Sequence, residues 1–178
     1  MPTARPLPYS RHAIDEDDIA AVAAVLRGDW LTTGPNVRDF EIALARQCGT
    51  DHAVSCANGT AALHLSCLAL GLGADHTVIV PAMTFAATAN AARLAGAEIW
   101  FADCDPDSGL MGVAQLDDAL AALKRKGRRA AAVFPVDLAG QCGDLEAIAA
   151  RARAEGLAIV EDSCHALGTF YQRRDGSW

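Results

Sequence analysis

The stretch from Thr77 to Ala102, "TVIVPAMTFAATANAARLAGAEIWFA", contains two short apolar runs on either side of a longer alanine-rich one. The first run is rich in β-branched residues, and the second contains an isoleucine and two aromatic residues, which is typical of strands. Between them, residues 84–96 have a helical composition and end at a glycine. A strand, a helix and a second strand in this order predict a βαβ unit with parallel strands.

The same alternation continues along the chain. Further strands are expected at 52–56, 130–136 and 157–161, and further helices at 60–71, 115–127 and 144–156. The expected strands are apolar along their whole length, as in a sheet whose two faces are both covered by helices. The sequence therefore predicts an α/β fold with a mostly parallel sheet.

Two helices are expected ahead of the sheet, over 15–28 and 37–49. The apolar residues of the first helix share one face by helical spacing, and they are Ile19, Val22, Ala23 and Leu26. We expect residues 1–35 to form an N-terminal arm and a leading helix outside the sheet, and residues 36–178 to form the α/β domain.

The composition argues against several classes of protein. A hydrophobic fraction of 52% over 178 residues is that of a globular chain with a real core. The net charge of −7 and the lack of a basic stripe argue against a nucleic-acid partner. No apolar run reaches the ~18 residues of a membrane helix, and the N-terminus lacks the apolar core of a signal peptide, so we expect a cytoplasmic protein. Six cysteines without a CxxC pair are expected to be buried, reduced thiols.

Polar or glycine-containing loops follow the expected strands. In an open parallel sheet, ligands bind beyond the carboxyl ends of the strands. We therefore expect five loops to face one crevice and to form the candidate site. They are "ANGTAAL" from residue 57, "PAMTFAATAN" from residue 81, "DCDPDSG" from residue 103, "DLAGQCGD" from residue 137 and "DSCHALG" from residue 162.

The first of these loops places Gly59 and Thr60 where a strand leads into a helix. Free N–H groups and the helix dipole at such a helix N-terminus suit a phosphate group. An ordinary N-cap, made by Asn58 or Thr60, is the alternative interpretation. The loop matches neither GxGxxG nor the GxxxxGK phosphate loop.

The loop "DCDPDSG" resembles the start of a calcium loop, with Asp103, Asp105 and Asp107 at alternate positions. The sixth position is Ser108 rather than Gly, and the twelfth is Ala114 rather than Glu. We therefore interpret it as a solvated turn and predict no metal site.

Several chemically capable residues have a structural interpretation when taken singly. Cys164 and His165 are adjacent, so on an extended loop their side chains point apart and do not form a nucleophilic pair. Phe85, at the start of a helix, is by default a core residue. Asp137 is by default a cap for the helix that starts near Asp144.

Taken together, these motifs resemble the DegT/DnrJ/EryC1 (StrS) family of sugar aminotransferases. The matching pieces stand in the family's order between residues 9 and 171, and they are "LTTGPNVRDFE", "SCANGTAALHL", "VIVPAMTFAATANA", "PVDLAGQ" and "VEDSCHALGTFY". The resemblance implies fold type I, with a three-layer α/β/α large domain that binds pyridoxal 5′-phosphate, and a homodimer when intact. The forms "PVD" and "DSCHALG" are most similar to the branch that aminates a 4-keto sugar nucleotide on the way to pseudaminic acid.

The resemblance also implies roles for single residues toward the cofactor. The backbone of Thr60 and Ala61 would hold the phosphate, and Phe85 would stack on the pyridine ring. Asp162 would pair with the protonated ring nitrogen and so keep the ring an electron sink. His165 stands where the family has Gln or His near the oxygen substituent of the ring. Glu161 keeps its interpretation as a polar residue at the end of a strand.

For the substrates, the resemblance implies two half-reactions. An amino-acid donor, commonly glutamate, supplies the amino group, and a keto-sugar nucleotide receives it. The segment "LTTGP", with Gly34 giving backbone freedom, would lie toward the sugar nucleotide.

The chain departs from the family in its lysines. It contains only Lys124 and Lys126, both expected in the solvated end of a helix, where cations complement the helix dipole. The Schiff-base lysine of the family is expected downstream, in a segment that resembles "SFHPxK". We therefore expect the N-terminal part of an aminotransferase without its small C-terminal domain, with no catalytic residue and no transaminase activity of its own.

Two other functions stay open at this point. A branch of the same family with His in place of the lysine dehydrates sugar nucleotides with the same cofactor. A non-catalytic, phosphate-binding α/β module without a cofactor is the second alternative.

Overall fold

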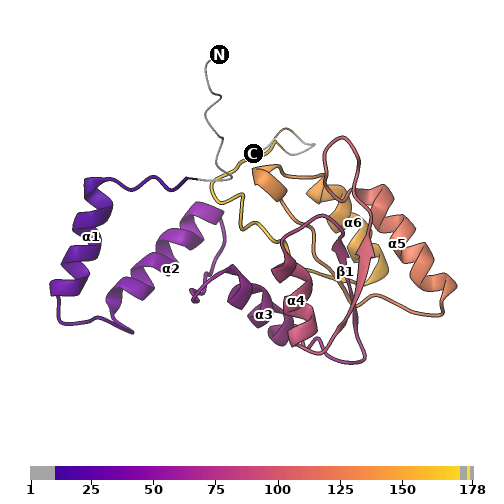
Figure 1. Cartoon of the computed structure of the whole chain (residues 1–178), viewed down its shortest axis with the longest axis horizontal. Coiled ribbons are helices and arrows are strands. Elements are labelled where there is room, and N and C mark those ends of the chain that lie inside the picture. The colour runs from indigo at the N-terminus through magenta and orange to yellow at the C-terminus, as the bar shows by residue number, and fades with distance from the viewer. Residues whose placement is uncertain (1–10, 173–175, 177–178) are drawn as a thin grey trace, which may run out of the picture.

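The computed structural model describes residues 11–172 and residue 176. Within this part of the chain, two helices come first, and helices and strands alternate from residue 59 onward (Figure 1). The helices are α1 (Glu16–Arg27), α2 (Pro35–Cys48), α3 (Gly59–Ala69), α4 (Ala86–Leu94), α5 (Val113–Arg125) and α6 (Leu145–Glu155), with a short 3₁₀ turn η1 (Leu138–Gly140). The strands are β1 (Thr77–Pro81), β2 (Glu98–Ala102), β3 (Ala132–Val133) and β4 (Ala158–Ile159).

The four strands form one parallel sheet in the order β2-β1-β3-β4. β1 pairs with β2 along its full length, from Thr77 opposite Glu98 to Pro81 opposite Ala102. Every residue of β1 is buried, as its continuous apolar sequence predicts. The βαβ unit expected from residues 77–102 is therefore confirmed.

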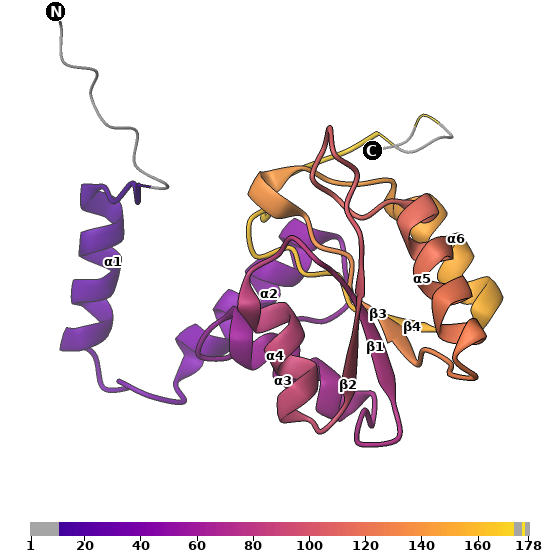
Figure 2. The same cartoon turned by 45° about the vertical axis from the view of Figure 1, so that its right-hand side comes forward.

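Helices cover both faces of the sheet (Figure 2). On one face, α3 and α4 pack on β1, with Cys67 and Ala91 fully buried between the layers. On the other face, α5 and α6 pack on the sheet through Leu116 and Ile148. The three-layer α/β/α arrangement is thus confirmed. Because the strands are parallel, the loops that follow them all lie at the carboxyl ends of the strands.

The expected strand at 52–56 does not form. Its residues have no strand partner among the described residues. The backbone N–H and the hydroxyl of Ser55 instead donate to Oε1 of Glu41 on α2, at 2.8 and 2.9 Å. A side chain has therefore taken the hydrogen bond that a neighbouring strand would accept, which explains the failure of the prediction.

Two other strands are shorter than expected. Of 130–136 and 157–161, only two residues each form a regular ladder. Pro135 lacks an N–H group and so interrupts the ladder, although its carbonyl still accepts from Asp162 N at 2.9 Å. An isolated parallel bridge between Val136 and Asp162 continues the pairing beyond the interruption.

α1 lies apart from the sheet in both views (Figures 1 and 2). Asp15 and Asp18 form a reciprocal capping box at its start, but no residue of the helix is buried. The predicted apolar face is therefore present and uncovered. Residues 1–10 of the expected arm lie outside the described residues. None of the described helices is both long and apolar enough to cross a membrane.

The expectation of buried thiols is only partly correct. Cys67 is buried, Cys104 and Cys142 are half-buried, and Cys48, Cys56 and Cys164 are exposed. Cys48 ends α2, which buries a single alanine, and Cys56 lies on the segment that fails to join the sheet. Both thiols are exposed because their segments have little packed against them.

Candidate active site

A cavity of about 180 Å³ lies at the carboxyl ends of β1, β3 and β4. Four of the five expected loops contribute to its walls, through residues that include Thr60, Thr84, Phe85, Asp137, Asp162 and His165. β2 lies on one side of β1 and β3 on the other, so the strand order reverses at β1. Ligands bind at such switch points of open α/β sheets.

The fifth loop, "DCDPDSG", does not reach this cavity, so the expectation of one crevice for all five loops is wrong in this respect. Its strand, β2, is the edge strand beyond β1, and the loop lines a separate hollow with Gln141. Oδ1 of Asp105 accepts hydrogen bonds from the N–H groups of Asp107 and Ser108 and from the Ser108 hydroxyl. These bonds to Ser108 hold the pKa of Asp105 below its usual range.

Asp162 is the buried carboxylate of the cavity, at 6% exposure. Its Oδ2 accepts a hydrogen bond of 2.6 Å from the hydroxyl of Thr88, which is fully buried on α4. Since Thr88 uses its proton on Asp162, it must accept the 2.8 Å hydrogen bond that joins it to the hydroxyl of Thr84. The two threonines therefore orient the carboxylate.

Sequence reasoning missed Thr84 and Thr88. Thr88 lies on α4, and Thr84 directly precedes Phe85, the N-cap residue of this helix. The spacing of four residues was the available signal, but only the packing of α4 shows that Thr88 faces Asp162.

Cys164 contacts the same carboxylate. Its N–H donates to Oδ1 of Asp162 at 3.3 Å. The hydrogen bond of the thiol to Asp162, together with burial, raises the pKa of Cys164 to about 11. Cys164 is therefore a protonated thiol rather than a thiolate nucleophile, which agrees with the structural interpretation of the Cys164–His165 pair.

At the start of α3, one backbone N–H group is capped by a side chain and two are available to a ligand. Oδ1 of Asn58 accepts the N–H of Ala61 at 2.9 Å, so Ala61 is already engaged and does not line the cavity. In the described part of the chain, the N–H groups of Gly59 and Thr60 have no acceptor. The N-cap alternative is thus correct for Asn58, and it leaves two N–H groups for an anion.

Gly59 has a packing requirement that sequence reasoning did not show. A Cβ atom at this position would lie 2.6 Å from Sγ of Cys164. The glycine therefore allows the loop after β4 to approach the start of α3, and it closes one wall of the cavity.

Phe85 is not a core residue, because 70% of it is exposed. It is the N-cap residue of α4 and lines the cavity with an extended backbone. A large aromatic ring exposed beside a cavity is a surface on which a planar ligand can stack.

His165 is held by the turn that follows β3. Its Nδ1 accepts the N–H of Ala139 at 3.2 Å, so the neutral ring carries its proton on Nε2. Ala139 has a positive φ of 57°, which is uncommon for a residue other than glycine and costs of order 1 kcal/mol. The turn thus keeps a strained conformation that fixes the imidazole.

Asp137 is not the cap of α6, since Asp144 fills that role through a hydrogen bond from Ala147 N. Asp137 is only 1% exposed, and its Oδ2 accepts from the hydroxyl of Ser163 at 2.9 Å. Its Oδ1 is buried without a hydrogen-bond partner among the described residues. Burial, with the nearby carboxylate of Glu161, raises the pKa of Asp137 to about 6.

Ser163 lies between two acids, because its hydroxyl is also 2.7 Å from Oε1 of Glu161. One hydroxyl proton cannot serve two carboxylates, and the raised pKa of Asp137 allows that carboxyl group to hold the second proton. Glu161 is exposed, as a residue at a strand end should be, but it also belongs to this cluster beside Asp162.

Gly34 and the two lysines lie outside the cavity. Gly34 is the N-cap residue of α2 and does not line the cavity. Its φ of −87° requires no glycine, but a Cβ would lie 2.6 Å from Cβ of Trp30. Lys124 and Lys126 are exposed at the end of α5, as expected, and Nζ of Lys126 lies 5.1 Å from the ring centroid of Trp100.

Comparisons with known proteins agree on one family. A model of the DegT/DnrJ/EryC1/StrS aminotransferase family matches residues 12–177. The UDP-4-amino-4-deoxy-L-arabinose--oxoglutarate aminotransferase of Shewanella sediminis is 40% identical over 166 residues, which are 93% of this chain and 41% of that protein.

Solved structures give the same result. A DegT DnrJ EryC1 StrS aminotransferase from Brucella abortus is 44% identical, with a TM-score of 0.76 over 82% of this chain and 39% of that one. The PLP-form of the putative sugar aminotransferase Spr1654 from Streptococcus pneumoniae is 30% identical, with a TM-score of 0.81 over 93% and 45%. The fold-type I architecture is thereby confirmed, and the chain spans about two fifths of the length of these relatives.

Proposed function

This chain belongs to the DegT/DnrJ/EryC1/StrS aminotransferase family, and on that premise we propose that it is the cofactor-binding N-terminal part of an enzyme that transfers an amino group to a keto-sugar nucleotide. One observation carries the proposal. Asp162 is a buried carboxylate at the floor of a cavity that also has an exposed aromatic ring and open helix N–H groups.

The residues around the cavity fit pyridoxal 5′-phosphate. The N–H groups of Gly59 and Thr60 would bind the phosphate, and Phe85 would stack on the ring. Ala61 would not bind the phosphate through its N–H group, because that group already donates to Asn58. The cavity, at about 180 Å³, is smaller than pockets that enclose a whole small molecule, so this chain would supply one side of the binding site.

Asp162 would hold a proton on the ring nitrogen, because a buried carboxylate strongly favours a cationic partner. The hydrogen bonds from Thr88 and Cys164 N restrict its two oxygens to one orientation. His165, protonated on Nε2, would donate a hydrogen bond toward the oxygen substituent of the ring. When bound, the protonated ring accepts the electron pair released at the carbon that exchanges its amino group.

For the substrates, we propose glutamate as donor and a UDP-linked 4-keto sugar as acceptor. The relative from Shewanella sediminis is named for a 4-amino sugar on UDP and for oxoglutarate. A keto sugar on the way to pseudaminic acid, suggested by "PVD" and "DSCHALG", would be aminated at the same ring carbon. Gly34 and the segment around it remain a proposed contact for the sugar nucleotide.

We further propose that amino transfer requires a lysine that this chain lacks at the cavity. Lys124 lines a different hollow, and Lys126 lies over Trp100. The intact protein would be a cytoplasmic homodimer. The exposed apolar side chains of Ile19, Val22 and Leu26 on α1 would then be covered by a second copy.

Binding of pyridoxamine 5′-phosphate to this chain tests the cofactor proposal. This probe has no aldehyde, so it cannot react with the two surface lysines. Equilibrium dialysis should show saturable binding that Asp162→Asn weakens at least tenfold, because a neutral amide cannot pair with a ring cation. Asp103→Asn, an equal loss of charge on the loop outside the cavity, should bind as the parent chain does.

The results separate the alternatives. Binding that depends on the phosphate but not on Asp162 would favour a phosphate-binding module without a role for the ring. No binding by the parent chain would contradict the proposal. In the intact protein, formation of oxoglutarate from glutamate in the presence of a UDP-4-keto sugar would test the substrates.

A further inference from the structure

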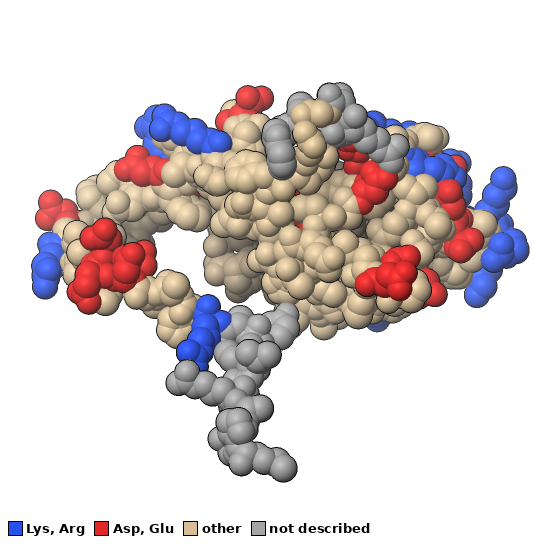
Figure 3. All heavy atoms as spheres, turned by 90° about the horizontal axis from the view of Figure 1, so that it is seen from above, with Lys and Arg blue, Asp and Glu red and all other residues tan. Residues whose placement is uncertain are grey.

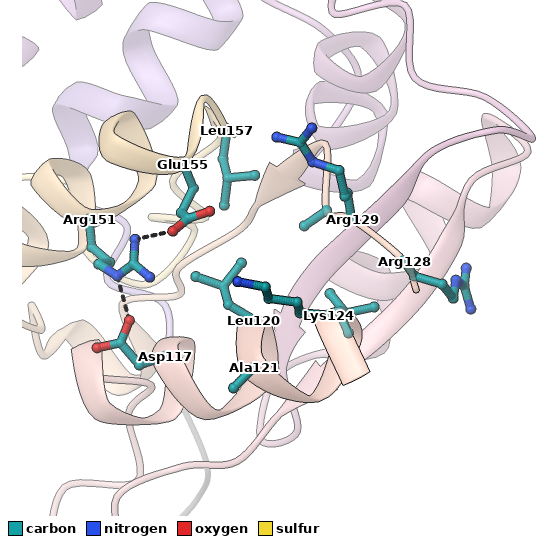
Figure 4. A pocket seen from close by; sticks show the side chains of 11 residues that line it. Asp117, Leu120, Ala121, Lys124, Arg128, Arg129, Arg151, Glu155 and Leu157 are labelled. Atoms are coloured by element: carbon teal, nitrogen blue, oxygen red, sulfur yellow. Dashed lines mark hydrogen bonds and ion pairs between the residues drawn. The ribbon is translucent and has the colours of Figure 1, made fainter. Parts of the chain in front are cut away.

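A second hollow, of about 650 Å³, lies at the end of the strands opposite to the cavity around Asp162. It is bounded by the last turns of α5 and α6 and by the segments that lead into β3 and β4 (Figure 4). Because the strands are parallel, their amino ends all lie on this side of the sheet. The volume is within the range of roughly 300–1,000 Å³ that is typical of small-molecule sites.

The floor of the hollow is apolar. Leu120, Leu123 and Leu157 line it together with two alanines. Leu120 is only half-buried, so the body of a ligand could still remove apolar surface from water here.

The charged residues around this floor are not balanced. Arg151 donates to both Asp117 and Glu155, and its single positive charge offsets one of these two carboxylates. Arg128 is paired with Glu98 and Thr77 and points away from the hollow (Figure 4). Neither Asp117 nor Glu155 forms an ion pair with the other two cations of the hollow.

Lys124 and Arg129 are those two cations. Within the described residues, neither has a carboxylate partner. Figure 4 shows the side chain of Lys124 extending into the hollow toward Leu120, with Arg129 at its rim. Three cations (Lys124, Arg129 and Arg151) thus face two carboxylates, and the hollow combines an apolar floor with an excess of one positive charge.

The C-terminal ends of α5 and α6 lie at this hollow. A helix C-terminus carries a partial negative charge on its free carbonyl groups. Here, however, the carbonyl of Leu123 accepts from Lys126 N and Arg128 N, and that of Ala152 accepts from Leu157 N. One carbonyl group near the end of each helix is therefore already engaged.

The wider surface has the same sign. Five of the six residues from 124 to 129 are Lys or Arg, in a chain with a net charge of −7. Lys and Arg side chains gather at the end of the molecule where α5 and α6 lie (Figure 3). An anion approaching this acidic protein would be attracted to this end.

We propose that this hollow binds an organic anion with an apolar body. Its carboxylate, phosphate or sulfonate group contacts Lys124 and Arg129, and its body lies on Leu120 and Leu157. The site is remote from the cofactor cavity, so its ligand is an effector or a second small-molecule partner rather than a substrate of amino transfer.

The probe is 8-anilinonaphthalene-1-sulfonate, which carries one sulfonate on an aromatic body. We expect its addition to the ¹⁵N-labelled chain to shift the amide signals of residues 120–130 and 151–157. Lys124→Gln and Arg129→Gln should each weaken binding roughly three- to tenfold, the range of a partly exposed ion pair. Arg125→Gln removes the same charge from α5 outside the hollow and should leave the affinity within twofold.

Two further measurements identify the source of the affinity. The neutral analogue N-phenyl-1-naphthylamine should bind more weakly than the sulfonate, and added salt should reduce only the affinity of the sulfonate. Shifts confined to α1 and α2, or equal affinities of the Lys124→Gln and Arg125→Gln variants, would overturn the proposal. Equal binding of inorganic phosphate alone would show a general anion site and would also overturn it.

Discussion

Thr88 on α4 donates a hydrogen bond of 2.6 Å to Asp162, which lies 74 positions later in the sequence beyond β4. Both residues are buried. The bond joins the helix that follows β1 to the carboxylate that we propose as the partner of the cofactor. It therefore links the packing of the sheet directly to the geometry of the site.

Replacing Thr88 by valine tests this link. Valine has almost the same shape, but it leaves Oδ2 of Asp162 without its buried donor, which costs about 1–3 kcal/mol. We expect Thr88→Val to lower the free energy of unfolding by that amount in urea and to weaken pyridoxamine 5′-phosphate binding. Thr88→Ser keeps the hydroxyl and should retain most of the affinity. Equal affinities of the two variants would show that the bond does not position Asp162.

Gly59 and Cys164 form a second testable pair. Glycine to alanine at an exposed helical position normally adds roughly 0.5–1 kcal/mol of stability. Here the new methyl group would lie 2.6 Å from Sγ of Cys164, so we expect Gly59→Ala to destabilise the chain instead. Cys164→Ala removes the sulfur, and the double variant should recover the loss. A double-mutant cycle by urea unfolding measures this coupling, and additive effects would rule out the contact.

Asp137 predicts a pH dependence of stability. Its pKa is about 6 in the folded chain against 3.8 for the ordinary group, so the folded state holds the proton more tightly. The free energy of unfolding should therefore fall as the pH rises from about 4 to about 6, and the loss should stay constant above that range. Asp137→Asn keeps the acceptor for Ser163 without the charge. Relative to the parent chain it should gain roughly 1–3 kcal/mol across this window.

Asp105 is the matched control for this experiment. Its pKa is lowered by Ser108, so the sign is opposite, and its contribution is present above the ordinary pKa and lost as the pH falls. Asp105→Asn should therefore lose stability relative to the parent chain at neutral pH. The same trend with pH in both variants would contradict the assignment of the titration to Asp137.

The hydrogen bonds of Glu41 give a prediction about how the segment 52–56 is held. It accepts from the N–H and the hydroxyl of Ser55, and these bonds lower its pKa. We expect Glu41→Ala to speed the hydrogen exchange of the Ser55 amide at neutral pH, whereas Glu41→Gln, which keeps an acceptor oxygen, should change it less. The two hydrogen bonds stabilise only the ionised form of the Glu41 carboxyl group. The protection of the Ser55 amide in the parent chain should therefore decrease as the pH falls below about 4.5. Unchanged exchange in Glu41→Ala would show that the segment is held by other contacts.

Much of the fold could be predicted from short patterns. Among the described residues, the six α-helices occur where apolar periodicity, first-turn acids or closing glycines indicate them, and the βαβ unit of residues 77–102 forms as predicted. These features depend on residues within about ten positions of one another, so they can be found along the chain. The expected strand at 52–56 did not form, and the backbone N–H of Ser55 bonds instead to Glu41, a partner outside the segment.

The candidate site divides in the same way. The sequence by itself determined which loops carry Thr60, Phe85, Asp162 and His165, because motif spacing and family resemblance are properties of the chain. Only the tertiary structure decided that Thr88 orients Asp162 and that Asp137 is buried beside Ser163 with an unpartnered oxygen. Likewise, it decided that the loop after β2 lies outside the cavity, since β2 is the edge strand. Strand order, burial and the pairing of distant polar groups come from long-range packing, and local sequence patterns do not specify them.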